Sequence, residues 1–350
     1  MPGLQRAPSV RRHGLKLWHY VVRRLLLLVP FVILLTSTTF LLSRVAPADP
    51  VGLAIGRHAT EEMREKVARQ FGLEKPLHVQ YLVFLRDLTR GDFGRSLASR
   101  APVINDLRRC FPATIELSLA ALTLATLIGV PLGLLAARCR DTAIDHGTRL
   151  ISIFGVSFPA FWLALMLQLL IVVLLPIWPI TGRFSDTVPP PTRITGLYVL
   201  DSILTLDFQS LGISLQYLFL PAVTLALGSL AEISRLTRSG VIEALSKDFV
   251  LNARASGLPE IVILFRHALR YAAIPILTIG GLLFTWTLSG AVLVEVIFAW
   301  PGLGRYAVKS SVFMDFRPIL AVVLVFGLSA ALVNLVIDVL YRALDPRVRY

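Results

Sequence analysis

The chain has 350 residues, of which 55% are hydrophobic and only 16% are charged. Soluble globular domains carry about 25% charged residues, and the mean hydropathy of this chain is +0.71, so the composition indicates an integral membrane protein. A net charge of +13 would suggest nucleic-acid binding in a soluble protein, but in a membrane protein it indicates basic cytoplasmic loops. We therefore expect no nucleic-acid partner. The two cysteines are too few for a disulfide framework or a metal-ligand cluster, and we expect no metal site.

Six uncharged stretches are long enough to cross a bilayer, because about 20 apolar residues span its ~30 Å hydrocarbon core. They cover residues 25–42, 117–137, 150–181, 208–231, 271–294 and 318–337. The third is longer than one span needs, and we expect it to leave the bilayer near Pro176 and Pro179. The pattern predicts an all-α integral membrane protein with six transmembrane helices.

The first of these stretches has a second interpretation as a cleaved signal peptide. Its apolar run is longer than the usual signal core and no A-x-A site follows it, so we favour a membrane anchor. The predicted layout is a tail at 1–24, transmembrane helix 1 at 25–44, an external helical region at 45–112, a core with the other five spans at 113–345, and a C-terminal end at 346–350.

The external region after the first span contains two helix patterns. Thr60 can cap a first helix that Gly72 ends, with two glutamates in its first turn. Pro76 can start a second helix, with Gly91 as its stop. We therefore expect an external helical insertion rather than an extended loop.

The distribution of Lys and Arg predicts the orientation in the membrane. These residues crowd the tail before the first span, the loops after the second and fourth spans, and the C-terminal end, while the short loops opposite carry fewer. The loop after the first span is too long to count under this rule. Both termini and the loop at 237–270 are therefore expected to be cytoplasmic.

The loop at 237–270 interrupts the apolar spans with two helical patterns. Residues 241–256 have helical spacing, Gly257 suits the left-handed position just past a helix end, and Pro259 suits the start of a new helix. Such a helix-turn-helix could lie in the groove of a partner protein or rest on lipid headgroups. The residue pattern alone leaves these two alternatives open.

Several stretches of the chain resemble the permease subunits of ABC importers, in the dipeptide/oligopeptide/nickel branch. They include "RRLLLLVPFVILLTSTTFLLSRVAPADP", "GDFGRSL", "FPATIELSLAA", "LFLPAVTLAL", "RLTRSGVIEALSKDFVLNARASGL", "VEVIFAWPGLGR" and "LVNLVIDVLYRALDPRVRY". The resemblance runs over nearly the whole chain from about Val21. Singly these matches are modest, but in this order they are strong together.

The resemblance implies a function in transport across the bacterial cytoplasmic (inner) membrane. Such a permease forms half of a translocation path with a second related permease, and two ATPase subunits bind it from the cytoplasm and hold ATP and Mg. A soluble extracytoplasmic binding protein delivers the substrate. The chain itself is then no enzyme and binds no cofactor, and it works by alternating access.

The resemblance also assigns the cytoplasmic loop a role as a coupling helix that fits a cleft on the ATPase, between spans four and five. The residues expected to make this contact are Ala253, Arg254, Ala255, Ser256, Gly257 and Leu258. The wider superfamily pattern E-A-A-x-x-x-G is kept here only at Ala253 and Gly257. That departure is typical of the peptide/nickel branch.

Other motifs carry no chemistry in this chain. The stretch that starts at Gly302 imitates a dinucleotide fingerprint, but it follows a membrane span instead of a strand, so we interpret it as a tight loop. The sequence has no G-x-x-x-x-G-K-[ST] loop and no catalytic constellation. ATP binding and hydrolysis by this chain are therefore not expected.

A few residues in or near the spans are candidates for the translocation path or a gate. They are Glu116, Gly129, Pro131, Gly133, Glu295 and Asn334. The alternative for the glycines is ordinary helix packing, and for the glutamates it is hydration or pairing at the interface, with Arg305 and Lys309 as partners for Glu295.

A stand-alone secondary transporter or channel is the rival function. It would need charged groups at mid-span for ion coupling, and none is evident in the sequence. The substrate is left open, since peptides, nickel chelates, glutathione and oligosaccharides all use permeases of this appearance.

Overall fold

The computed structural model describes residues 17–45, 60, 62, 65, 75–96, 98–174 and 178–344. These residues form helices joined by loops, with no β-strand among them apart from an isolated bridge between Arg95 and Pro102. The longer helices are α1 (Leu17–Val45), α4 (Leu77–Thr89), α5 (Val103–Arg138), α6 (Ala143–Ser157), α7 (Ala160–Leu174), α9 (Phe208–Leu245), α12 (Leu269–Ile297) and α14 (Phe316–Leu344). The shorter elements are α8 (Tyr198–Leu204), α10 (Asp248–Ala255), α11 (Glu260–Val262), the π-helical turn η1 (Ile263–Ala268) and α13 (Leu303–Val312). The predicted all-α class is confirmed for this part of the chain.

Five helical segments are long and apolar enough to cross a membrane. They are Val22–Leu41, Val103–Arg138, Phe208–Leu245, Glu260–Ile297 and Phe316–Leu340. A sixth is present if α6 and α7, which are bent by 101° relative to each other, count as one broken span. The structure therefore has five or six spans, depending on how this bent pair is counted.

The third span differs from the sequence prediction of one stretch at 150–181. The helix that begins at Ala143 ends at Ser157, and α7 starts at Ala160 in a new direction. Phe158 has an extended backbone, with φ −104° and ψ 133°, because the ring of a following proline disfavours the helical conformation, and Pro159 is that residue. The expected exit at Pro176 lies outside the described residues.

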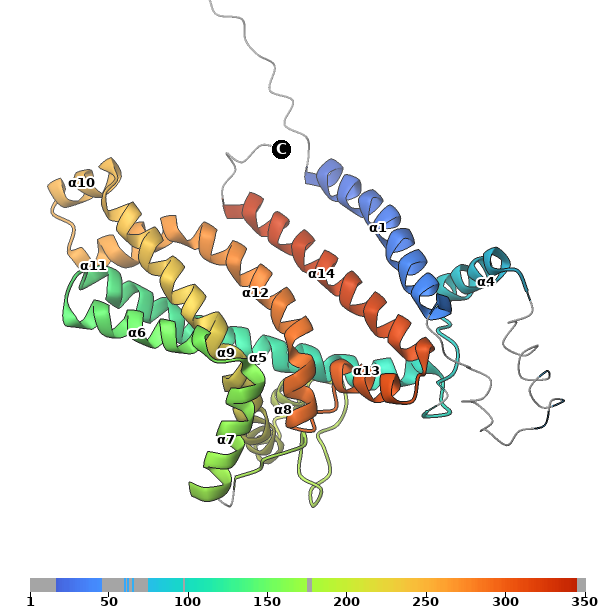
Figure 1. Ribbon diagram of the computed structural model, residues 1–350. Helices are drawn as coiled ribbons and strands as arrows, with labels where there is room; N and C mark the ends of the chain where they lie inside the picture. The colour runs from blue at the N-terminus through green and yellow to red at the C-terminus, as the bar shows by residue number, and fades with distance from the viewer. Residues whose placement is uncertain are drawn as a thin grey trace, which may run out of the picture.

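The two ends of the bundle carry different elements (Figure 1). The helix α10 lies beyond one end of α9, while α8 and α13 lie toward its other end. We refer to these as the α10 end and the α13 end. The most extensive helix contact joins α5 and α9, so this pair forms the centre of the fold.

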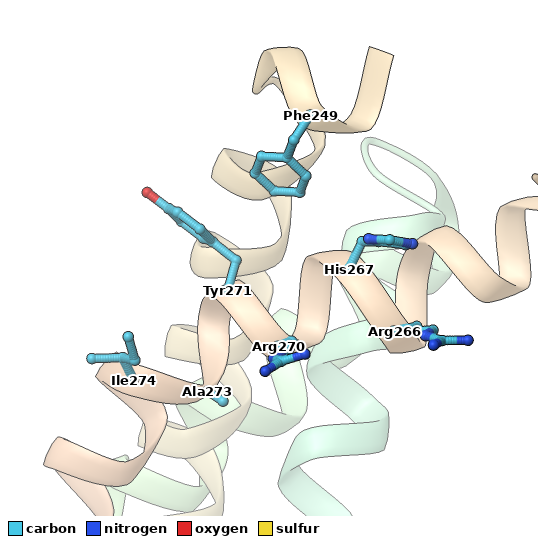
Figure 2. Close-up of a pocket in the computed structure, with 7 residues that line it drawn as sticks. All are labelled: Phe249, Arg266, His267, Arg270, Tyr271, Ala273 and Ile274. Atoms are coloured by element: carbon cyan, nitrogen blue, oxygen red, sulfur yellow. The ribbon is translucent and has the colours of Figure 1, made fainter. Parts of the chain in front are cut away.

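The loop predicted as one helix at 241–256 is divided in the structure. The span helix α9 continues to Leu245, Lys247 is extended with ψ 153°, and α10 begins at Asp248. Buried apolar residues continue across the break, including Val241 and Val250, so the apolar spacing that predicted a single helix could not reveal it. Figure 2 shows α10 lying over the start of α12, with the Phe249 ring 5.9 Å from the ring of Tyr271.

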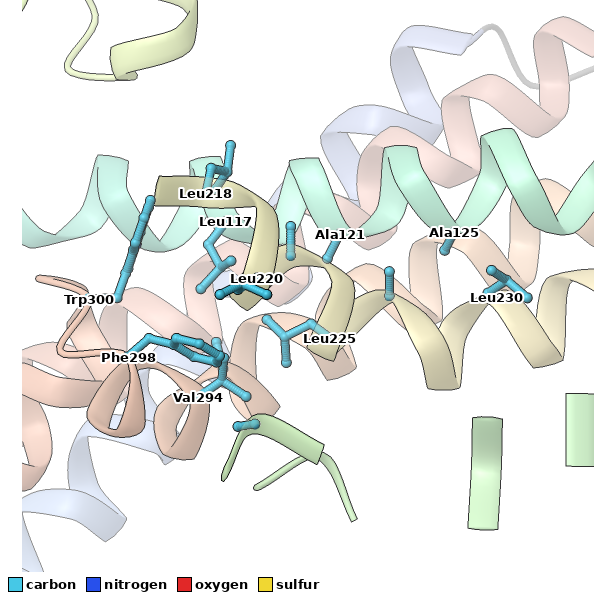
Figure 3. Close-up of a cluster of buried hydrophobic side chains, with 14 of the residues drawn as sticks. Leu117, Ala121, Ala125, Leu218, Leu220, Leu225, Leu230, Val294, Phe298 and Trp300 are labelled. Carbon is cyan, nitrogen blue, oxygen red and sulfur yellow. The ribbon is translucent and has the colours of Figure 1, made fainter. Parts of the chain in front are cut away.

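The main hydrophobic core lies between α5, α9 and the end of α12 (Figure 3). Leu117 from α5, Leu218 from α9 and Val294 from α12 meet there, with Phe298 and Trp300 from the loop after α12. Small residues on α5 let α9 approach closely along the same contact. Burial of these side chains is what orients the loop between α12 and α13.

The helices α1 and α14 lie side by side at the edge of the bundle (Figure 1). A Cβ atom on Gly327 would lie 2.5 Å from a Leu35 methyl carbon, so the glycine permits this contact. Arg24 and Asp338 form an ion pair of 2.7 Å between the same two helices. The first predicted span is therefore part of the fold.

The region at 45–112, predicted to be external, is described only in part. The helix predicted from Pro76 is confirmed as α4, and Gly91 follows it with a positive φ of 75°. The helix predicted between Thr60 and Gly72 falls almost entirely outside the described residues. The ring of Phe40 on α1 packs on Tyr81 and Phe84 of α4, which fixes α4 against the first span.

Candidate functional site

The turn after α10 has a defined cap. The Gly257 N–H donates to the Arg254 carbonyl at 2.9 Å, and the Leu258 N–H donates to the Ala253 carbonyl at 3.2 Å. This pair of bonds is a Schellman motif, which requires a left-handed residue just past the helix end. Gly257 supplies it with φ 75°, as predicted from its place in the sequence. The direction of the chain after α10 is thus fixed by local hydrogen bonds.

The six residues expected to contact an ATPase do not share one face. Ala253 is buried and packs with Val250 and Ile263 inside the chain, whereas the next five residues, Arg254 to Leu258, are exposed. An added Cβ on Gly257 would meet no atom within 4 Å. We define the exposed turn as residues 254–258, and the space outside it is open in this chain.

The exposed turn is joined firmly to the spans. The Arg254 guanidinium donates to both carboxylate oxygens of Glu260, at 2.7 and 3.2 Å, which ties α10 to the helix after the turn. That helix continues through η1 into α12 as one 38-residue helical segment. Its start packs on α9, where an added Cβ on Gly240 would lie 3.0 Å from the Cβ of Ala272. The chain therefore leads directly into a span on each side of this loop.

A buried carboxylate at the α10 end was missed by the sequence interpretation. Asp145, at the start of α6, is fully buried. Its two oxygens accept hydrogen bonds from the Arg238 guanidinium, both at 2.7 Å, and from Arg149 at 3.2 and 2.7 Å. The Asp141 N–H donates to it as well. This cluster joins α6 to the last turns of α9.

Glu295 is the centre of a second buried cluster, at the α13 end. Its side chain is 0% exposed, so of the two alternatives expected for it, hydration or pairing at the interface, hydration is not found in the structure. One oxygen accepts from the Thr114 hydroxyl at 2.6 Å, and the other accepts from the Arg305 N–H at 3.0 Å. The Thr114 hydroxyl also accepts from the Leu303 N–H at 2.8 Å.

Close packing against Glu295 and α12 explains why positions 302 and 304 are glycines. An added Cβ on Gly302 would overlap the Glu295 carboxylate, and one on Gly304 would lie 2.6 Å from the Cα of Val292. The first turn of α13 is thus pressed against α12, with its N–H groups directed at a negative group. The stretch from Gly302 was expected to be a tight loop, but from Leu303 onward it forms the first turn of α13. The predicted partner Arg305 reaches Glu295 through its backbone N–H, since its guanidinium donates to the Ala299 carbonyl.

Glu116 forms a buried ion pair beside this cluster. The Arg183 guanidinium donates to one of its oxygens at 3.0 and 2.6 Å, and the Val199 N–H donates to the other at 2.7 Å. The same guanidinium lies 3.8 Å from the centre of the Tyr198 ring and 5.8 Å from that of Trp300. The alternative of pairing is therefore confirmed for Glu116, but inside the protein and with a partner that the sequence did not indicate.

Gly129 and Gly133 lie in the contact between α5 and α9. An added Cβ on Gly129 would lie 3.0 Å from the Leu230 carbonyl oxygen, and one on Gly133 would lie 2.5 Å from that of Ser234. Both glycines therefore serve close helix packing. Pro131 lies between them on the exposed side of α5, which continues through it without a break.

The structure brings together only some of the candidates for a path or gate. Glu116 and Glu295 both belong to the buried polar region around Trp300 at the α13 end. Asn334 is exposed on α14, apart from this region. In the described part of the chain, no group of three or more His, Cys, Asp or Glu residues could hold a metal ion.

Comparison with known families now decides the identity. A family model described as the binding-protein-dependent transport system inner membrane component matches residues 129–350. A second model, for the N-terminal part of a binding-protein-dependent transport system membrane component, matches residues 17–118. The chain belongs to this family of ABC importer permeases.

Relatives of this permease are similar over nearly their full lengths. The probable D,D-dipeptide transport system permease protein DdpB of Escherichia coli is 44% identical over 310 residues, covering 89% of this chain and 91% of the relative. The di/tripeptide transport system permease protein DppB of Pseudomonas aeruginosa is 39% identical, covering 95% and 98%. The glutathione transport system permease protein GsiC of Salmonella choleraesuis is 35% identical, covering 95% and 99%. The predicted family is confirmed.

Family membership gives the permease its general role. It is a non-enzymatic, multi-pass component of the inner membrane. In ABC systems the ATPase is a separate subunit, and permeases work with ATPase and binding-protein partners. The residues of this permease that sequence reasoning missed are Asp145, Arg238 and Arg183, whose contacts join segments far apart in the chain.

Proposed function

We propose that this permease forms half of the translocation path of an importer for peptides or a related small solute. Support for the substrate class comes from relatives whose names refer to D,D-dipeptides, di- and tripeptides, and glutathione. A second, related permease forms the other half of the path. Two ATPase subunits bind on the cytoplasmic side and hold ATP and Mg, and an extracytoplasmic binding protein delivers the substrate.

The observation that carries the proposal is the exposed turn at 254–258. It stands at the α10 end, its backbone is held by the cap at Gly257, and no described residue crowds that glycine. A rigid helix end with small residues lets the backbone of a partner approach closely. We assign this turn to the ATPase contact, with Ala253 supporting it from inside the chain.

The orientation of the permease follows from the charge at its two ends. The segments that meet at the α10 end, from the end of α5 to the start of α6 and from the last turns of α9 to α10, carry Arg140, Arg149, Arg235, Arg238 and Lys247. Short loops rich in Lys and Arg remain on the cytoplasmic side of a membrane. The α10 end is therefore assigned to the cytoplasm, with both termini, and the α13 end faces the binding protein.

The mechanism is alternating access driven by the ATPases. When they close on ATP, they move α10, which leads into α9 on one side and through η1 into α12 on the other. Those two helices pack on α5, so a shift of α10 reorients the spans as packed units. The rival function, a transporter that works alone, would need ion-coupling groups, but Glu116 and Asp145 are already engaged in buried ion pairs.

The proposal can be tested by placing bulk on the exposed turn. Ala255→Trp adds a large side chain at an exposed position of α10, and Gly257→Trp also places a Cβ at positive φ, which costs about 1–2 kcal/mol. Both variants should still insert in the membrane. Each should reduce co-purification of the ATPase, or abolish ATP-driven uptake by vesicles that contain all partners.

A matched control is Ser311→Trp, which adds the same bulk to an exposed helical position on α13, at the opposite end. It should leave ATPase co-purification unchanged. If Ala255→Trp and Gly257→Trp bind the ATPase and transport like the parent, the exposed turn is a membrane-surface element and the coupling role is wrong.

A further inference from the structure

A pocket lies between α10 and the start of α12 (Figure 2). It has a volume of about 490 Å³ and is lined by Phe249, Arg266, His267, Arg270, Tyr271, Ala273 and Ile274. Phe249 comes from α10, and the other six residues come from η1 and the first turns of α12. The pocket is therefore separate from the exposed turn at 254–258.

Two of the side chains that line the pocket are arginines. Among the described residues, no ion pair joins Arg266 or Arg270 to an acidic group. The nearby Glu243 is already engaged, because it pairs with Lys247 at 3.0 Å and accepts a hydrogen bond from the Tyr271 hydroxyl at 3.0 Å. The pocket is thus an open positive site that can accept an anion.

The pocket lies where a membrane surface would cross the protein. Arg266 and Arg270 occupy the first turns of the spanning segment Glu260–Ile297, and the uncharged run of that segment starts at Tyr271. A tyrosine ring such as that of Tyr271 is typical of the headgroup level. Basic pockets between transmembrane helices on the cytoplasmic side bind anionic headgroups.

We propose that this pocket binds the phosphate-bearing headgroup of an anionic phospholipid. The two arginines bind the phosphate, and the rings of Phe249 and Tyr271 contact the first part of the lipid chains. The assignment to a cytoplasmic headgroup rests on the orientation given under the proposed function. A lipid held there contacts α10 and α12 at once, so it joins the coupling helix to the span that follows it.

The test measures phosphatidylglycerol binding to the assembled transporter by native mass spectrometry, with phosphatidylcholine for comparison. The double variant Arg266→Gln/Arg270→Gln should bind phosphatidylglycerol about 30-fold more weakly, since each arginine near an anionic surface contributes about 1 kcal/mol and 1.4 kcal/mol is a factor of ten. The control Arg140→Gln/Arg235→Gln removes two basic groups that are 60% and 69% exposed. It should change binding by less than about threefold.

Three outcomes would overturn the proposal. The first is an equal loss of phosphatidylglycerol binding in the pocket double variant and in the control double variant. The second is equal binding of phosphatidylglycerol and phosphatidylcholine. The third is displacement of the lipid by excess inorganic phosphate, which would make free phosphate the ligand. The charge-preserving variant Arg266→Lys/Arg270→Lys separates charge loss from misfolding, because it should keep most of the binding.

The experiment also distinguishes this site from the ATPase contact. If the Gln double variant loses the ATPase in detergent while its lipid binding is unchanged, the pocket is a contact with the partner protein and the lipid proposal fails. If Gly257→Trp has no effect but the Gln variant loses lipid, the proposed coupling role fails and the lipid site stands.

Discussion

Gly133 tests how tightly α5 and α9 are held together. In Gly133→Ala, the new Cβ would lie 2.5 Å from the Ser234 carbonyl oxygen and 2.6 Å from the Thr237 Cβ. Carbon atoms in contact are normally about 3.5–4.0 Å apart, so the two helices have to separate by roughly 1 Å. Overpacking of this kind costs about 1–3 kcal/mol, and the helix preference of alanine over glycine offsets up to about 1 kcal/mol. We expect a net loss of about 1–2 kcal/mol in the free energy of unfolding.

The assay is denaturant unfolding of the purified protein in detergent, followed by circular dichroism. Gly228→Ala is the matched control, because Gly228 lies within α9 and an added Cβ would meet no atom within 4 Å. This control should be stabilised by about 0.5–1 kcal/mol. If the free energy of unfolding changes in the same direction and by the same amount in both variants, the close contact at Gly133 does not limit the packing, and the reasoning is refuted.

Two further predictions concern the buried carboxylates. Asp145→Asn leaves Arg238 without its charge partner and should lower the free energy of unfolding; adding Arg238→Gln should recover part of this loss, and a purely additive double variant would contradict the pairing. Glu295→Gln should cost about 1–3 kcal/mol in the same unfolding assay, because an amide turns an NH₂ group toward either the Thr114 hydroxyl or the Arg305 N–H. A Glu295→Gln protein as stable as the parent would show that the two acceptors are not both needed.

The sequence predicts the spans well because span formation depends mainly on local composition. The apolar runs at 208–231 and 271–294 fall within the observed helices. The bend after Phe158 was missed because an uncharged run does not show where a helix turns, although Pro159 is a signal for it. The break at Lys247 has no such signal, since buried apolar residues continue on both sides of it.

The buried polar clusters could not be predicted because their partners are distant in the chain. Glu116 and Arg183 are separated by 67 residues, and Asp145 and Arg238 by 93. A glutamate near the end of a span is usually at the water interface, so Glu295 was expected to be hydrated or paired there and not buried. The helix α13 folds back over Glu295 and supplies backbone N–H donors, which the pattern of side chains in a sequence does not reveal. By contrast, the positive φ of Gly257 was predictable because a local helix cap fixes it.

The segment Glu260–Ile297 begins just after the exposed turn and carries Glu295 near its other end. With a rise of 1.5 Å per residue, its 38 residues measure about 57 Å along the axis. A lever of that length converts a tilt of about 3° at one end into a displacement of about 3 Å at the other. Under the proposed ATPase contact, small rotations at the exposed turn are amplified at the α13 end by distance alone, with η1 and Pro275 as the places where this segment can bend instead.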